Sequence, residues 1–318
     1  MTRFLGVFLL VATLYVSLRF SNENATTLEA HQILANRLGF YGVLTLGVGL
    51  LIISGGIDLS IGSVVGLSAV GFAVLLKRGV PPVPSVLIVL AGSAAIGLLH
   101  GLLITGLNLQ PFLVTLCGLF AYRGLARQLS DKSIGLSDAA DSLQDQIYQI
   151  RDVICEPAKL RGLPGQLMIM LVVAALFALI MHASVYGRYL YAIGYNEKAA
   201  AYAGIPVKRY KIFAYVWCSV LAGGVGGILE MLDVETATPS NVGTLYELYA
   251  ITGAVIGGCS LRGGEGNVLG ILCGTAVLPL LRSNIVFWNL PNEAEYTIIG
   301  AALLLGTIAD ELFKRRWR

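Results

Sequence analysis

Residues 79–122 contain no Asp, Glu, Lys or Arg, and this uncharged stretch constrains the fold of the chain more than any other feature. A helix that crosses a membrane needs about 20 mostly apolar residues, so the stretch can hold two crossings joined by a short turn. Only 13% of the 318 residues are charged, whereas soluble domains carry about 25%. The sequence therefore predicts an all-α integral membrane protein and disfavours a soluble enzyme.

Apolar runs predict about ten transmembrane helices in a single transmembrane domain that covers residues 1–318. Two of the runs, 40–54 and 245–258, are short for a full crossing. They could be tilted or re-entrant, and residues 28–39 could lengthen the first. The expected spans are 4–20, 40–54, 59–76, 85–106, 111–127, 165–182, 210–230, 245–258, 266–287 and 295–312.

The distribution of Lys and Arg predicts the orientation, because cytoplasmic loops carry an excess of them. The loop 183–209 and the C-terminal residues 314–318 are both basic. If both are cytoplasmic and there are ten spans, then the N-terminus is cytoplasmic too. The insert 128–164, which is rich in Asp and holds an expected polar helix over 137–150, then lies outside.

Composition and cysteine spacing disfavour two kinds of partner. The net charge is only +3 and the basic residues are confined to loops, so no nucleic-acid interface is expected. The cysteines show no C-x-x-C pattern and no His at ligand spacing, so neither a metal site nor a disulfide is expected. The five are Cys117, Cys155, Cys218, Cys259 and Cys273.

Asp58 lies between two apolar runs, where an ionisable side chain is costly and usually faces a partner, water or a pathway. Gly55 and Gly56 beside it predict non-helical backbone, which is tolerated at membrane depth only inside protein or a water-filled cavity. Three roles remain open for Asp58: accepting backbone N–H groups at a helix start near Ser60, pairing with a basic group, and binding hydroxyls of a passing solute. A broken polar element of this kind favours transport over catalysis.

Other polar residues near the spans are expected to be structural. His100 is expected to be a satisfied helix-packing residue, and Arg123 is expected to extend toward the outer interface. A cluster of acidic residues near the end of one span is expected to form a solvated rim. The cluster is Glu230, Asp233 and Glu235.

Loop 183–209 contains an expected two-turn helix. Asn196 is a good N-cap, Glu197 suits the positive helix end, and Gly204 can end the helix. Such a helix is not stable alone, so it packs on lipid headgroups or on a cytoplasmic partner. The small residues expected on its packing face are Ala199, Ala200 and Ala203.

Paired glycines mark a tight turn after residue 256. The chain contains no G-x-x-x-x-G-K-[ST] sequence, so a phosphate-binding loop is disfavoured and a structural turn between close-packed helices is expected. The glycines are Gly257, Gly258, Gly263, Gly264 and Gly266.

Four segments in order resemble the membrane permease subunits of bacterial ATP-binding-cassette (ABC) importers of the ribose, galactose and xylose class. Residues 55–63 read G-G-I-D-L-S-I-G-S, one change from the family's G-G-I-D-L-S-V-G-S. Residues 111–126, 187–207 and 246–266 are similar to the family's P-x-F-I-V-T-L…R-G-L-A, G-R-x-x-Y-A-I-G-x-N-x-x-A-A…G-I-x-V and Y-E-L-x-A-I…V-I-G-G-x-S-L-x-G-G-x-G elements.

The resemblance implies a multi-pass permease of the bacterial inner membrane that is not itself an enzyme. It implies a second permease chain, identical or paralogous, a periplasmic solute-binding protein, and a separate cytoplasmic ABC ATPase that carries the ATP and magnesium. No cofactor is expected on this chain. The substrate path or its structural motif would involve Gly55, Gly56, Asp58 and Ser60, and the ATPase-coupling helix would involve Asn196, Glu197, Ala199, Ala200 and Gly204.

The chain departs from the family at Tyr249, where Asp is common, and this leaves open what Glu247 pairs with. Other functions remain as alternatives. A branched-chain amino-acid permease is a distant relative, and an ion-coupled carrier could use Asp58 as its coupling carboxylate. A membrane enzyme would need a carboxylate or metal-ligand cluster, and no such cluster has convincing spacing in the sequence.

Overall fold

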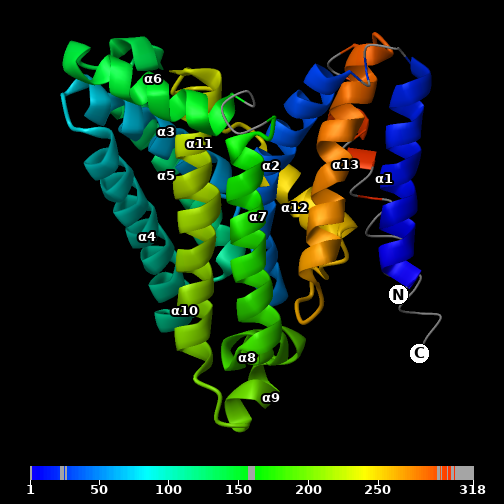
Figure 1. Cartoon of the computed structure of the whole chain (residues 1–318). Helices are drawn as coiled ribbons and strands as arrows, with labels where there is room; N and C mark the ends of the chain where they lie inside the picture. The colour runs from blue at the N-terminus through cyan, green and yellow to red at the C-terminus, as the bar shows by residue number, and fades with distance from the viewer. Residues whose placement is uncertain are drawn as a thin grey trace.

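The computed structural model is a bundle of helices with a two-residue strand pair as its only sheet among the described residues (Figure 1). The structure describes residues 2–21, 25, 27–156, 162–291, 294, 296–298, 300–301 and 304. The elements are α1 (Thr2–Ser21), α2 (Leu28–Ile53), α3 (Ile61–Lys77), α4 (Pro82–Gly106), α5 (Pro111–Leu129), β1 (Ile134–Gly135), η2 (Leu136–Asp138), α6 (Asp141–Cys155), α7 (Gly165–Ala178), η4 (Leu179–Ala183), α8 (Val185–Tyr195), α9 (Glu197–Tyr202), α10 (Val207–Cys218), η5 (Ser219–Val225), α11 (Gly226–Val234), β2 (Thr236–Ala237), α12 (Tyr246–Ile256) and α13 (Val268–Phe287).

The all-α membrane fold expected from the sequence is confirmed. Five described helices are long and apolar enough to cross a membrane, namely Leu28–Ile53, Pro82–Gly106, Gly165–Ala183, Val207–Val234 and Val268–Phe287. Shorter apolar helices lie at Gly6–Phe20, Ile61–Lys77 and Tyr246–Ile256. The expected tenth span, 295–312, lies outside the described residues apart from isolated positions, as does the basic end 314–318.

Two expected span lengths can now be compared with the structure. The short run 40–54 is part of the 26-residue helix α2, so of the alternatives left open its extension through 28–39 is confirmed. In contrast, α12 has only 11 residues, fewer than the about 20 needed for a crossing. It is therefore a partial crossing element, followed by the glycine-rich turn and α13.

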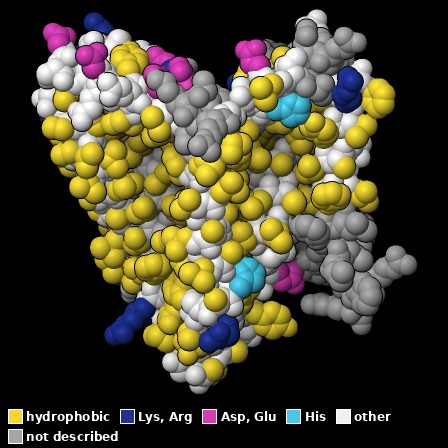
Figure 2. Space-filling model, viewed as in Figure 1, with side chains coloured by type: hydrophobic (Ala, Val, Ile, Leu, Met, Phe, Trp, Pro, Cys, Tyr) yellow, Lys and Arg dark blue, Asp and Glu magenta, His cyan; other side chains and the backbone are white. Residues whose placement is uncertain are grey.

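Helix α2 lies at the centre of the bundle. Every residue from Gly39 to Ile53 is buried, and the helix packs against α7, α10, α12 and α13. The outward faces of α4, α5 and α7 carry exposed apolar side chains such as Leu87, Phe120 and Val172. Figure 2 shows apolar side chains covering the middle of the visible face. A helix bundle that is apolar both inside and outside is expected for a protein surrounded by lipid.

The two polar parts of the chain lie at opposite ends of the bundle (Figure 1). Helix α6 and the β1–β2 pair cover one end, while α9 projects from the other, toward which the N-terminal end of α1 also points. Helix α6 starts at Asp141 rather than at residue 137 and buries Leu143 and Ile147. The structure thus separates the insert 128–164 from the loop 183–209, as the expected orientation requires.

Two membrane helices contain π-helical segments. The segment η4 extends α7, and η5 joins α10 to α11. Gly224 in η5 faces α4, because a Cβ at this position would lie 2.9 Å from the Ser93 hydroxyl oxygen. Such segments are rare and occur mostly as single turns within α-helices.

Candidate functional site

The glycine pair before Asp58 ends α2 in a hydrogen-bonded turn. The N–H of Gly55 donates to Ile52 O at 2.9 Å, and the N–H of Gly56 donates to Leu51 O at 3.0 Å. This pattern is a Schellman motif, which requires a left-handed residue after the helix, and Gly55 supplies it with φ 79°. Gly55 and Gly56 therefore break the helix and turn the chain toward Asp58.

Asp58 forms the next turn with its own side chain. Its Oδ1 accepts the backbone N–H of Ser60 at 2.8 Å and the Ser60 hydroxyl at 2.6 Å. Asp and Asn favour this kind of local turn because the side chain replaces a backbone acceptor. Asp58 is 1% exposed, and α3 begins directly after Ser60. One carboxylate oxygen is thus used to shape the backbone between two membrane helices.

The other carboxylate oxygen of Asp58 faces His100 of α4. Its Oδ2 lies 3.4 Å from His100 Nδ1, and neither atom has a hydrogen-bond partner among the described residues. The Nε2 of His100 lies 2.9 Å from the Tyr122 hydroxyl oxygen on α5. A Cβ at Gly118 would lie 2.9 Å from that Nε2, so this glycine makes room for the ring. Asp58, His100 and Tyr122 form a buried polar cluster that joins the turn before α3 to α4 and α5.

Sequence reasoning treated His100 as an ordinary packing residue. The Tyr122 contact agrees with that interpretation, but the proximity of His100 to Asp58 was not foreseen. Pairing with a basic group was one of the three open roles of Asp58, and His100 is the group that the fold brings to it. No periodicity in the sequence connects residues on α4 to the turn after α2.

Glu247 at the start of α12 packs against the first turn of α3. A Cβ at Gly62 would lie 2.2 Å from the Glu247 Oε2, and the Gly62 backbone N–H donates to this carboxylate. Arg123 lies close enough to interact electrostatically with Glu247 and donates a hydrogen bond to Val242 O. The question of what Glu247 pairs with is therefore answered by Gly62 and Arg123. Arg123, which was expected to extend toward the outer interface, bonds to the segment between β2 and α12, beside the cluster that contains Ile134 and Ile147.

The acidic residues expected to form a solvated rim at the end of α11 differ in exposure: Asp233 is exposed, Glu235 is partly exposed and Glu230 is buried. Glu230 is buried and accepts a hydrogen bond from Tyr246 Oη at 2.8 Å. Asp233 accepts one from Asn36 Nδ2 at 2.7 Å. The third, Glu235, lies 2.8 Å from Arg151 of α6. The interpretation as a solvated rim is therefore wrong for Glu230, and each of the three carboxylates connects the end of α11 to another part of the chain.

Arg151 also holds its neighbours in the insert. It lies 2.5 Å from Glu156 and 3.1 Å from Asp152. Burial lowers the pKa of Arg151, but hydrogen bonds to Glu156 and Asp152 and the charge of Glu235 outweigh it, so the net pKa is raised. The charged guanidinium of Arg151 therefore connects α6 to Glu235 at the end of α11.

The expected short helix in loop 183–209 is α9. Asn196 caps it by accepting the N–H of Ala199 at 3.0 Å. Gly204 ends it with φ 82°, in a second Schellman pattern in which the N–H of Ile205 donates to Ala200 O at 3.1 Å. Glu197 in the first turn forms an ion pair with Lys211 of α10, whose Nζ lies 2.9 Å from Glu197 Oε2. The helix is therefore fixed to α10 by a charge pair as well as by its caps.

The small residues of α9 differ in burial. Ala200 is 5% exposed and packs with Ile193 and Val207 of the same chain. Ala199 and Ala203 are exposed, and Tyr202 is 91% exposed. The exposed side of α9 therefore includes Ala199 and Tyr202, while Ala200 packs the helix against the bundle.

Glycines bring the base of α8 into backbone contact with the end of α2. A Cβ at Gly194 would lie 1.9 Å from Ile53 O and 2.4 Å from Gly264 N. Gly264 itself donates its N–H to Ile53 O at 2.9 Å. A Cβ at Gly263 would lie 2.9 Å from Gly55 Cα. These residues, which we call the glycine junction (Ile53, Gly55, Gly194, Gly263 and Gly264), join three segments where side chains would not fit.

The remaining turn glycines serve two nearby contacts. Gly257 packs on α13, since a Cβ there would lie 2.4 Å from Gly270 O, and Gly258 follows with φ 94°. Gly266 O accepts a hydrogen bond from Tyr191 Oη of α8 at 2.7 Å. The turn is thus fixed to α8 as well as to α2. The structure therefore connects the base of α9, through α8 and the glycine junction, to the turn that carries Asp58.

Comparison with known proteins places this architecture in a family. The model of the family described as branched-chain amino acid transport system / permease component matches residues 32–306. A ribose import permease protein of Bacillus subtilis (strain 168) is 30% identical over 96% of this chain and 91% of its own length. A ribose import permease protein of Escherichia coli (strain K12) is 31% identical over 84% of this chain and 81% of its own.

A third relative is the autoinducer 2 import system permease protein of Photorhabdus luminescens, 28% identical over 96% of this chain and 91% of its own length. No solved structure matches the chain. The expected resemblance to ABC importer permeases is thereby confirmed, and the chain belongs to the branched-chain amino acid transport system / permease component family.

Proposed function

We propose that this chain is the permease subunit of an ABC importer for a small sugar or sugar-like solute in the bacterial inner membrane. It pairs with a second permease chain, identical or paralogous, and receives solute from a periplasmic binding protein. A separate cytoplasmic ABC ATPase holds ATP and magnesium and hydrolyses the nucleotide. This chain then contributes the path and the coupling element and performs no chemistry itself.

One observation carries the proposal: the projecting helix α9 is linked to the buried turn at Asp58 through close backbone contacts. Gly194 lies at the end of α8, next to the Asn196 cap of α9, and contacts Ile53 and Gly264 without any side chain between them. Backbone packed at this distance transmits displacement because it has no flexible side chain to absorb it. A force applied by an ATPase at α9 would therefore reach the polar turn inside the bundle.

The substrate class rests on the relatives and on the chemistry of the polar cluster. Relatives that match most of this chain are named for ribose and autoinducer 2 import. Asp58 Oδ2 and His100 Nδ1 are buried polar atoms without a hydrogen-bond partner among the described residues, and hydroxyl groups bind such atoms well. A branched-chain amino acid is the alternative solute that the family's description suggests.

The test is affinity purification of this chain from its own gently solubilised membranes, with co-purifying proteins identified by mass spectrometry. The expected result is recovery of a soluble protein that contains a G-x-x-x-x-G-K-[ST] sequence. The variant Tyr202→Glu, on the exposed side of α9, is expected to lose this protein. The control Gln146→Glu places the same charge on the exposed face of α6 and is expected to keep it.

Ala200 is unsuitable for this test, because it is buried within the chain and its replacement would disturb packing. Repeated purification of well-folded chain without any ATPase would reject the importer proposal. An ion-coupled carrier with Asp58 as its coupling carboxylate would then be tested by the pH dependence of solute uptake.

A further inference from the structure

A cleft of about 690 Å³ lies beside α9, between the end of α4 and the start of α10. Its floor contains Ile104 and Val207, which are buried, and the polar residues Thr105 and Asn108. The walls come from α9 and from the turn that leads into α10. The lining residues are Ile104, Thr105, Asn108, Glu197, Lys198, Ala201, Ile205, Pro206, Val207, Lys208, Arg209 and Lys211.

The cleft carries an excess of positive charge. Among the described residues Glu197 is the one acidic residue that lines it, and Glu197 is already paired with Lys211 at 2.9 Å. Within the part of the chain that the structure describes, Lys198, Lys208 and Arg209 have no ion pair. Figure 2 shows basic side chains at the end of the molecule from which α9 projects. Three uncompensated cations around one cleft favour an acidic occupant.

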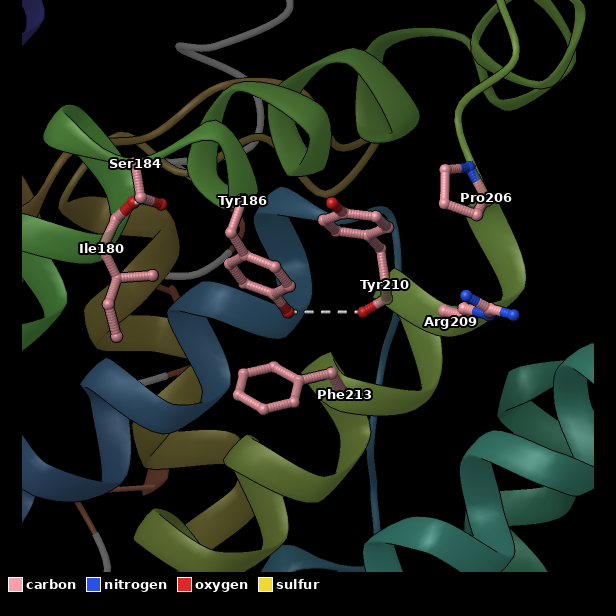
Figure 3. A pocket seen from close by; sticks show the side chains of 7 residues that line it. All are labelled: Ile180, Ser184, Tyr186, Pro206, Arg209, Tyr210 and Phe213. Atoms are coloured by element: carbon pink, nitrogen blue, oxygen red, sulfur yellow. Dashed lines mark hydrogen bonds between the residues drawn. The ribbon is translucent and has the colours of Figure 1, made fainter.

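The neighbouring pocket has a different character from the cleft. It has a volume of about 480 Å³ and is lined mainly by apolar and aromatic side chains (Figure 3). The rings of Tyr186 and Tyr210 stack with centroids 5.1 Å apart, and Phe213 packs edge-on against Tyr186 at 5.0 Å. In Figure 3 the Arg209 side chain points away from these rings. Pro206 and Arg209 line both this aromatic pocket and the basic cleft, so the two hollows adjoin each other there.

We propose that the basic cleft receives acidic side chains of the ATP-binding subunit, next to the contact made by α9. This inference rests on the proposed function and adds the chemistry of the contact. The cleft borders the element that projects furthest from the bundle at this end (Figure 1), and a subunit docked on α9 would reach it without entering the membrane.

A phospholipid headgroup is the other anionic occupant to consider. A bound lipid needs an apolar path for its acyl chains beside the cationic groups. Of the three cations, only Arg209 adjoins the apolar pocket at Tyr186 and Phe213, whereas Lys198 and Lys208 line the cleft alone. The floor of the cleft instead ends at Asn108, whose φ of 56° marks a tight turn after α4. This arrangement fits a carboxylate-bearing protein surface better than a lipid.

The experiment uses the full chain in phosphatidylcholine nanodiscs and, as probe, the ATPase recovered with the unmodified chain. Binding is measured at several salt concentrations for Lys198→Glu, Lys208→Glu and the pair together. Each reversed charge is expected to weaken binding about threefold or more near 0.15 M salt, with a shallower salt dependence. Lys208→Gln is expected to lie between the wild type and Lys208→Glu. The control Lys132→Glu reverses an exposed charge near α6 and is expected to change nothing.

The outcomes separate the two proposals. If no ATPase is recovered with the unmodified chain, the proposed function fails. If the ATPase binds the unmodified chain and the reversed variants equally well, the cleft does not take acidic side chains, although the proposed function stands. Equal ATPase binding combined with loss of co-purified phosphatidylglycerol would overturn the inference in favour of a lipid site.

Discussion

Replacing Gly194 with Ala tests the glycine junction directly. The added Cβ would lie 1.9 Å from Ile53 O and 2.4 Å from Gly264 N, where unstrained contacts exceed about 3.4 Å. The backbone must therefore move, and overpacking of this kind costs about 1–3 kcal/mol. The same movement separates the Gly264 N–H from Ile53 O, which costs about 1–3 kcal/mol more when the groups stay buried. Ala favours a helix over Gly by about 1 kcal/mol, so a net loss of about 3 kcal/mol is expected.

The assay is equilibrium unfolding in mixed micelles with a rising fraction of sodium dodecyl sulfate, followed by tryptophan fluorescence. Gly92→Ala is the matched control, since a Cβ at Gly92 in α4 meets nothing within 4 Å. The control is expected to unfold at the same detergent fraction as the wild type or slightly later. If Gly194→Ala also unfolds like the wild type, the close contact between α8, α2 and the turn does not exist, and the transmission argument fails with it.

Three further predictions concern other parts of the chain. Asp58→Asn keeps an acceptor for the Ser60 N–H and is expected to fold. Asp58→Ala leaves the Ser60 N–H unpaired, so its free energy of unfolding is expected to fall by about 1–3 kcal/mol in the same assay. Equal stability of the two variants would contradict this role of Asp58. Arg151→Met removes the contacts to Glu156 and Glu235, so the free energy of unfolding is expected to fall by about 1–2 kcal/mol, and by less at high salt. A loss that does not change with salt would contradict the ionic nature of these contacts. Burial raises the pKa of the Cys155 thiol to about 11, so in a variant that keeps Cys155 alone, maleimide labelling should keep accelerating above pH 9.5; a plateau near pH 9 would show an ordinary thiol.

The membrane helices were largely predictable because apolar composition reports burial in lipid or protein directly. The alternatives left open for the start of α2 have a physical cause. The first part of this helix carries polar residues, for which a low hydropathy predicts a loop. In the structure these residues are helical and form hydrogen bonds to distant segments. Gln32 donates to Gly162 O and Asn36 donates to Asp233. A helix that reaches beyond the apolar layer and is held there by such contacts cannot be delimited by apolar runs.

The candidate site was only partly predictable for a different reason. Motifs along the chain identified Asp58 and α9, because caps and turns depend on neighbouring residues. Contacts between helices depend on how each helix is rotated in the bundle. The approach of His100 to Asp58, the contact of Glu247 with Gly62 and the inward direction of Ala200 all depend on that rotation. A single sequence does not contain it.

The π-helical segment η5 gives the helix that runs from Val207 to Val234 a joint near its middle. Its lower part, α10, is tied to α9 by Lys211 and Glu197, and its upper part leads to Glu235, which Arg151 holds against α6. Backbone hydrogen bonds in a π turn depart from the regular helical ladder, so bending is easier there than in the helix on either side. The two parts of this helix, α10 and α11, can then tilt separately about η5, α10 together with α9 and α11 together with α6.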